Sequence, residues 1–115
     1  MSNVQLEEGY VNIPNELLDA VIKIPFDDEH YNIILVCWRY TYGFNHNGTE
    51  LSVSFISKAT GISKRYLWKK IKTLIDAKVL TVVKKSIFTT SRIIRFNENY
   101  EQWEYSTTVP HTLGR

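Results

Sequence analysis

Five cations with no acid among them, on one short segment, are the residues of this chain whose spacing most suggests chemistry. The segment runs from Thr60 to Leu74, and its cations are Lys64, Arg65, Lys69, Lys70 and Lys72. An exposed helix usually alternates its charges, because opposite charges three or four residues apart stabilise it. Ammonium and guanidinium groups without nearby acids are instead suited to binding the oxygens of a polyanion.

The charge asymmetry extends beyond this segment. Between residues 51 and 97 there are eleven Lys and Arg and a single acid, Asp76, so this part carries +10 while the rest of the chain carries −8. Such a separation within a chain of 115 residues predicts one basic face that binds a polyanion. The alternative is a lysine-rich surface that is only solvated.

Catalytic and metal-binding functions have little support in the sequence. His30, His46 and His111 are scattered without metal-binding spacing, and the chain has no Gly-x-x-x-x-Gly-Lys phosphate loop. The single cysteine, Cys37, allows no intramolecular disulfide and is expected to be a small buried residue. No nucleophile has a recognisable base partner. We therefore expect no catalytic residues, no metal site and no cofactor, and a protein that is not an enzyme.

A membrane location is also disfavoured. The longest unbroken apolar run, residues 33–38, is far shorter than the roughly 20 residues that a membrane helix needs. The first ten residues are acidic and polar, and they do not resemble a secretory signal. We therefore expect no membrane association and a cytoplasmic location.

The cations need a scaffold that turns them outward, and the remaining pattern predicts one. Apolar residues at helical spacing predict helices at residues 13–23, 26–43, 55–60 and 64–77, with Asn15, Asp27, Ser54 and Ser63 as their amino-terminal caps. Alternating and β-branched residues predict a short strand at 50–54 and a hairpin of residues 79–85 and 91–96. Gly61 suits the end of the third helix, so only a three-residue turn precedes the fourth helix.

This order indicates an α+β, mostly helical fold: a winged helix-turn-helix with three to four helices and a small β-hairpin wing. We expect it to occupy residues 1–104, with residues 105–115 as a flexible tail or a linker. On a helical wheel Leu67, Ile71 and Leu74 form one stripe of the fourth helix. The opposite face carries Arg65, Lys69, Lys72 and Thr73, so this helix should present a cationic surface to solvent.

In a helix-turn-helix, the second helix enters the major groove of double-stranded DNA with its amino-terminal residues leading. That recognition helix is residues 63–77 here, and residues 79–96 form the wing on the DNA backbone. The expected DNA-binding residues are Ser63, Lys64, Arg65, Tyr66, Lys69, Lys72 and Thr73 on the helix, and Lys84, Lys85 and Arg92 on the wing. Arg65 or Lys69 is suited to guanine O6 and N7. Lys70 should point sideways into solvent, and Trp68 should lie in the core.

Three stretches resemble the amino-terminal domain of phage replication protein O, a family of origin-binding initiators. They are GYVNIPNELLDAV (residues 9–21), CWRYTYGFNHNGTELSVSFISKATGISKRYLWKKIKTLIDAKVL (residues 37–80) and NENYEQW (residues 97–103). The resemblance implies a winged helix that binds repeated origin sites in a bacterial host cell, usually as a homodimer. Carried over residue by residue, its contact helix is Ser63 to Thr73.

Full initiators of that family continue into a carboxyl-terminal part that recruits the replicative helicase or a helicase loader. This chain stops at Arg115, so it is expected to be a piece of a longer protein or a small stand-alone protein. The fold by itself leaves two other functions open. One is a winged-helix transcription regulator, and the other is a small phage protein whose basic face binds an acidic protein partner.

Overall fold

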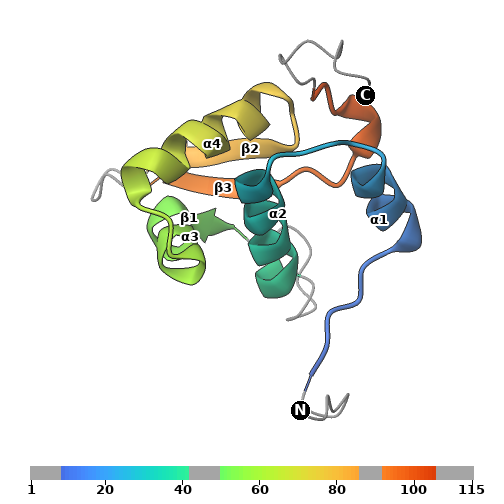
Figure 1. The fold of residues 1–115 in the computed structure, drawn as a ribbon, viewed down its shortest axis with the longest axis horizontal. Helices are drawn as coiled ribbons and strands as arrows, with labels where there is room; N and C mark the ends of the chain where they lie inside the picture. The colour runs from blue at the N-terminus through green and yellow to red at the C-terminus, as the bar shows by residue number, and fades with distance from the viewer. Residues whose placement is uncertain (1–8, 42–49, 86–91, 106–115) are drawn as a thin grey trace.

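Helices packed on a small antiparallel sheet make up the chain (Figure 1). The computed structural model describes residues 9–41, 50–85 and 92–105. In chain order the elements are α1 (Asn15–Ile22), α2 (Asp28–Thr41), β1 (Leu51–Ser52), α3 (Val53–Thr60), α4 (Lys64–Asp76), β2 (Leu80–Lys85), β3 (Arg92–Phe96) and the 3-10 turn η3 (Tyr100–Gln102). The predicted α+β, mostly helical fold is confirmed, and its arrangement is compatible with a winged helix.

The sheet joins the hairpin to the strand that precedes α3. Its strand order is β1-β3-β2 with both pairs antiparallel, and Leu51 of β1 lies opposite Ile94 of β3. β2 pairs with β3 from Leu80 opposite Phe96, with a shift in register between Val82 and Lys84. The residues predicted at the hairpin tip, 86–90, lie outside the described part of the chain. β1 thus ties the start of the helix-turn-helix to the hairpin that follows it.

One apolar core holds these elements together. α2 lies at the centre of the fold in Figure 1, and Ile33, Ile34, Cys37 and Trp38 are buried on it. The core continues onto the other elements through Leu67, Ile71, Leu74, Val79, Leu80, Ile94 and Phe96. Burial raises the pKa of the Cys37 thiol to about 12, so the thiol stays protonated at neutral pH. Cys37 is therefore the buried packing residue that the sequence predicts.

The turn between α3 and α4 has the predicted chemistry. Gly61 adopts the left-handed conformation at φ +79°, and its N–H donates to the carbonyl of Ser57 at 2.9 Å. Ser63 caps α4, because its hydroxyl oxygen accepts a hydrogen bond from the Tyr66 backbone N–H at 3.4 Å. Only residues 61–63 separate the two helices, so the angle between them is set by this short turn.

Two predicted caps are wrong. α1 begins at Asn15 itself, and Pro14 precedes it with its carbonyl accepting from the N–H groups of Leu17 and Leu18 at 3.1 Å. Pro14 is the cap residue, with an extended backbone at φ −58° and ψ 137°, and no side chain caps this end of the helix. α3 is capped by Ser52, whose hydroxyl oxygen accepts from the Phe55 N–H at 3.0 Å, and not by Ser54.

The earlier start of α3 changes which of its residues face the core. Val53, predicted in a strand, is the first residue of the helix and is buried with Ile56. Phe55 is 37% exposed, and its ring packs edge-on against Tyr40. On α1 the buried face is narrow, since Ile22 is 68% exposed while Leu17 and Val21 are buried.

The carboxyl-terminal segment packs against the core through the partly buried Tyr100 and Trp103. The Trp103 indole N–H donates to the carbonyl of Asn97 at 2.9 Å, and its ring packs against Phe96. Tyr105 is one residue beyond the predicted domain end, and its ring centre lies 4.4 Å from the ring centre of Phe26. The rest of the predicted tail, residues 106–115, lies outside the described chain. None of the helices within the described ranges is long and apolar enough to cross a membrane.

We predict that Leu67→Ala or Ile71→Ala each lowers the free energy of unfolding by about 2–5 kcal/mol, because each would leave a cavity in the core. Both side chains are 0% exposed. Leu35→Ala is the matched control: the Leu35 side chain is 56% exposed, so this variant should lose well under 1 kcal/mol of unfolding free energy. Urea unfolding measures all three, and equal losses at positions 35 and 67 would contradict the packing of α4.

Candidate nucleic-acid interface

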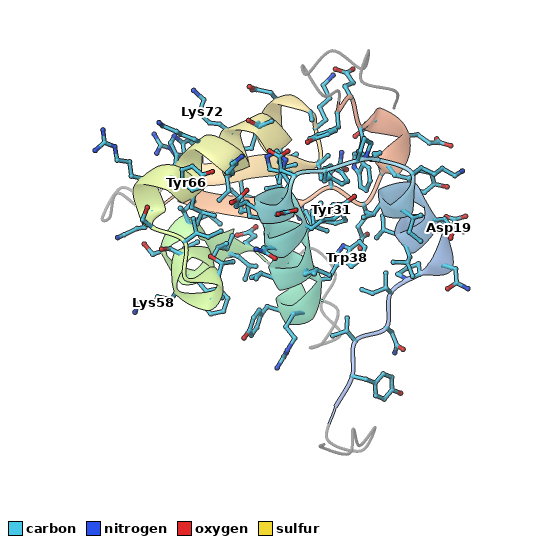
Figure 2. The ribbon with its side chains drawn as sticks, viewed as in Figure 1. Asp19, Tyr31, Trp38, Lys58, Tyr66 and Lys72 are labelled. Carbon is cyan, nitrogen blue, oxygen red and sulfur yellow. The ribbon has the colours of Figure 1, made fainter. Side chains whose placement is uncertain are left out.

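α4 is oriented by its apolar stripe. Leu67, Ile71 and Leu74 are each 0% exposed, and they fix the rotation of the helix about its own axis. The opposite face must then be solvent-accessible, and the exposed side chains of the predicted site on this helix are Ser63, Lys64, Arg65, Tyr66, Lys69, Lys72 and Thr73. Figure 2 shows Lys72 projecting away from the body of the protein. The sequence prediction of the outward face is therefore correct in geometry.

The cations on this face lack acidic partners among the residues that the structure describes. Within the described ranges of the chain, no acidic side chain forms an ion pair with Lys64, Arg65, Lys69 or Lys72. Outside this face, Lys78 does pair with an acid, since its ammonium lies 2.9 Å from the Glu104 carboxylate. Four positive charges on one face of a helix repel one another, and this repulsion is relieved when an anion binds there.

The prediction that Lys70 points sideways into solvent is wrong. Its ammonium donates a hydrogen bond to the Asp27 carboxylate at 2.9 Å, and its side chain is only 21% exposed. This hydrogen bond raises the pKa of Lys70 and lowers the pKa of Asp27. Because Asp27 is half exposed, the pair contributes only about 0–1 kcal/mol. Its role is to join the middle of α4 to the start of α2.

The side chains of His30 and Tyr105 lie next to the Lys70–Asp27 pair. His30, on α2, is 2% exposed, and its Nδ1 lies 3.1 Å from the Tyr105 hydroxyl and 3.8 Å from the Asp27 carboxylate. Burial lowers the pKa of His30, although the Asp27 carboxylate acts in the opposite direction. His30 is therefore mainly a neutral packing residue beneath the cationic helix, and residue types alone did not identify it.

The hydroxyl groups of the interface are partly engaged within the helix. The Ser63 oxygen caps α4, so this side chain can still donate its hydroxyl hydrogen to a phosphate. The Thr73 hydroxyl donates to the Lys69 carbonyl at 3.3 Å, which leaves its oxygen as an acceptor. Tyr66 is 46% exposed, and its ring centre lies 5.6 Å from the Lys70 ammonium. These side chains suit supporting contacts better than charge neutralisation.

The β2–β3 hairpin contributes one described side chain of the predicted site to this surface, that of Arg92. The guanidinium of Arg92, at the start of β3, lies 4.1 Å from the ring centre of Trp68 on α4. Trp68 is half buried and packs against the core, as the sequence predicted, but its contact with Arg92 was not foreseen. The backbones of Lys84 and Lys85 pair with Ile93 and Arg92, while the positions of their side chains lie outside what the structure describes.

Comparison with known proteins relates this chain to phage replication proteins. The chain matches the family described as bacteriophage replication protein O over residues 2–103. It is similar to the DNA replication protein gp18 of Salmonella phage P22, with 27% identity over 100 residues. That match covers 87% of this chain and 34% of the relative, so the chain spans about a third of the length of that protein. No solved structure gives a significant match.

The histidine beneath α4 predicts how stability depends on pH. His30 has a lower pKa in the folded protein than its ordinary value of about 6.5, so the unfolded chain takes up a proton first as the pH falls. The contribution of neutral His30 to the free energy of unfolding is therefore complete above pH 6.5, and it is lost as the pH falls below that value. Asp27, whose folded pKa is also lowered, contributes a further loss below about 3.9.

We therefore expect the melting temperature of the protein to fall between pH 7.5 and pH 5.5. In His30→Gln, which has no imidazole to protonate, that decrease should be smaller, whatever the variant's stability at pH 7.5. Thermal unfolding at both pH values measures the difference. An identical decrease in the two proteins would show that His30 does not titrate in this way.

Proposed function

The chain belongs to the bacteriophage replication protein O family, and we propose that it binds double-stranded DNA sequence-specifically at a phage or prophage replication origin. Residues 63–77 are the recognition helix in the major groove, and residues 79–96 are the wing on the DNA backbone. The protein acts in this role as a binding module of the bacterial cytoplasm, without catalysis. The observation that carries the proposal is the row of outward cations on α4 that no described acid neutralises.

The electrostatics of α4 favour duplex DNA as the partner. The major groove is wide enough to admit an α-helix, and the phosphates beside it supply the charge that α4 lacks. Lys64 and Lys72 lie towards the two ends of the exposed face and suit backbone phosphates. Arg65 and Lys69, between them, suit guanine, and a guanidinium can bind O6 and N7 at the same time. With six phosphate contacts, a plot of the logarithm of the binding constant against the logarithm of the salt concentration would have a slope of roughly −5.

Family membership supports a replication role over transcription. The chain matches a family of phage replication proteins along nearly all of its described length, and its relative in phage P22 is named as a DNA replication protein. A transcription regulator could use the same helix, because a fold does not determine function. An acidic protein could also cover the basic face. Both alternatives are outcomes of the experiments below.

The resemblance adds two partners to the proposal. One is a second copy of the chain, on inverted half-sites. The other is the replicative helicase or its loader, bound through a carboxyl-terminal part that lies beyond Arg115 in longer members of the family. Sedimentation of the protein with and without a duplex carrying two half-sites tests the first of these directly.

Arg65→Ala should weaken binding to the preferred site by about 1–3 kcal/mol and relax specificity at one base pair. The reason is that a bidentate arginine contact discriminates between bases, whereas a phosphate contact does not. Competition binding against single-base variants of the site measures the change. Lys23→Ala, which removes an exposed cation from the end of α1, is the matched control and should retain specificity. An equal loss on all sequences after Arg65→Ala would contradict base readout.

The source replication origin provides the test of biological role. Gel-shift experiments should show tighter binding to genomic fragments that contain the origin than to fragments of equal length from promoters or coding regions. The difference should persist at salt concentrations that abolish binding to random duplex, because non-specific binding is more electrostatic. Preference for a promoter fragment would favour the transcription regulator, and indifference to every duplex at low salt would favour an acidic protein partner.

A further inference from the structure

A gap in the row of cations on α4 is filled from another element. Lys64, Trp68 and Lys72 are spaced four residues apart, so they lie along one side of the helix, with about 6 Å between successive positions. The middle position carries an aromatic ring instead of a charge. The Arg92 guanidinium lies 4.1 Å from the centre of that ring, so a positive charge stands at this position although the helix itself does not supply it.

Stacking leaves this guanidinium able to bind an anion. Its carbon Cζ lies over the ring, 4.1 Å from the ring centre. A guanidinium has five N–H donors around its edge, and a cation–π contact uses none of them as a conventional hydrogen bond, so they remain available to a phosphate. Within the described residues, no acid forms an ion pair with Arg92. The contact also reduces the rotamer freedom of a long side chain before DNA arrives, so less entropy is lost on binding.

Trp68 is suited to hold Arg92 because its own position is fixed. The indole is half buried and packs against the apolar core. Arg92 is the first residue of β3 and pairs with Lys85 across the hairpin, so its backbone belongs to the wing. The contact therefore links the recognition helix to the wing at the last described strand pair before the hairpin tip, Lys85 opposite Arg92.

We propose that Trp68 is a positioning residue for DNA binding, which holds the Arg92 guanidinium between Lys64 and Lys72 so that it binds a backbone phosphate. This inference rests on the proposed function and adds a residue that carries no charge and that the sequence assigned to the core. Arg92 then acts as part of the helix surface and not as an independent contact of the wing.

The salt dependence of binding to a labelled duplex, measured by fluorescence anisotropy, tests the proposal. Arg92→Gln should reduce the steepness of the log–log slope by about one, which corresponds to one phosphate contact. Trp68→Leu should produce the same reduction although it removes no charge, and the Trp68→Leu/Arg92→Gln double variant should be no worse than either. Trp68→Phe keeps an aromatic face and should retain most of the slope. Lys23→Gln, on α1, is the matched charge control and should leave it unchanged.

A purely structural role for Trp68 would give a different result. Affinity lost with the wild-type slope in Trp68→Leu, or losses that add in the double variant, would overturn the proposal. If Trp68→Leu does not fold, Arg92→Lys decides the question, because it keeps the charge on the surface but cannot stack as a planar group. We expect Arg92→Lys to bind more weakly and with a shallower slope than the wild type, and wild-type behaviour would overturn the proposal. Failure of the wild type to bind any duplex would instead contradict the proposed function.

Discussion

The packing of α4 against the core is the constraint on which the rest of the interface depends. Leu67, Ile71 and Leu74 are fully buried, and a helix held by three such residues cannot rotate without exposing them. The same rotation commits Arg65 and Lys69 to solvent, so burial on one side creates the charged surface on the other. Stability and the proposed binding are in this way two consequences of one amphipathic pattern.

Contacts with other elements change which positive charges the exposed face of α4 carries. Lys70, which lies between the two faces of α4, is drawn to Asp27 at the start of α2 and does not add to the cations facing outward. Arg92 is brought from the hairpin onto Trp68, at the position where the helix lacks a charge. Contacts between elements thus remove one positive charge from the margin of the interface and add another within it.

The sequence was sufficient for features set by local spacing, and insufficient for contacts between distant residues. Periodicity predicted the outward face of α4, and Gly61 and Ser63 predicted its turn and its cap. Choosing between neighbouring serines failed at α3, because the cap depends on where strand β1 ends, and β1 ends at Ser52 through pairing with β3. The Lys70–Asp27 pair joins residues 43 apart in sequence, and nothing in either segment indicates the other.

Amide chemical shifts of the protein during titration with duplex DNA test the central claim most directly, because they locate the bound surface without altering any residue. The account predicts that the perturbed amides cluster at residues 63–73 and at the start of β3, with the amides of α1 unchanged. Perturbations centred on α1 and η3, with those of α4 unaffected, would contradict it.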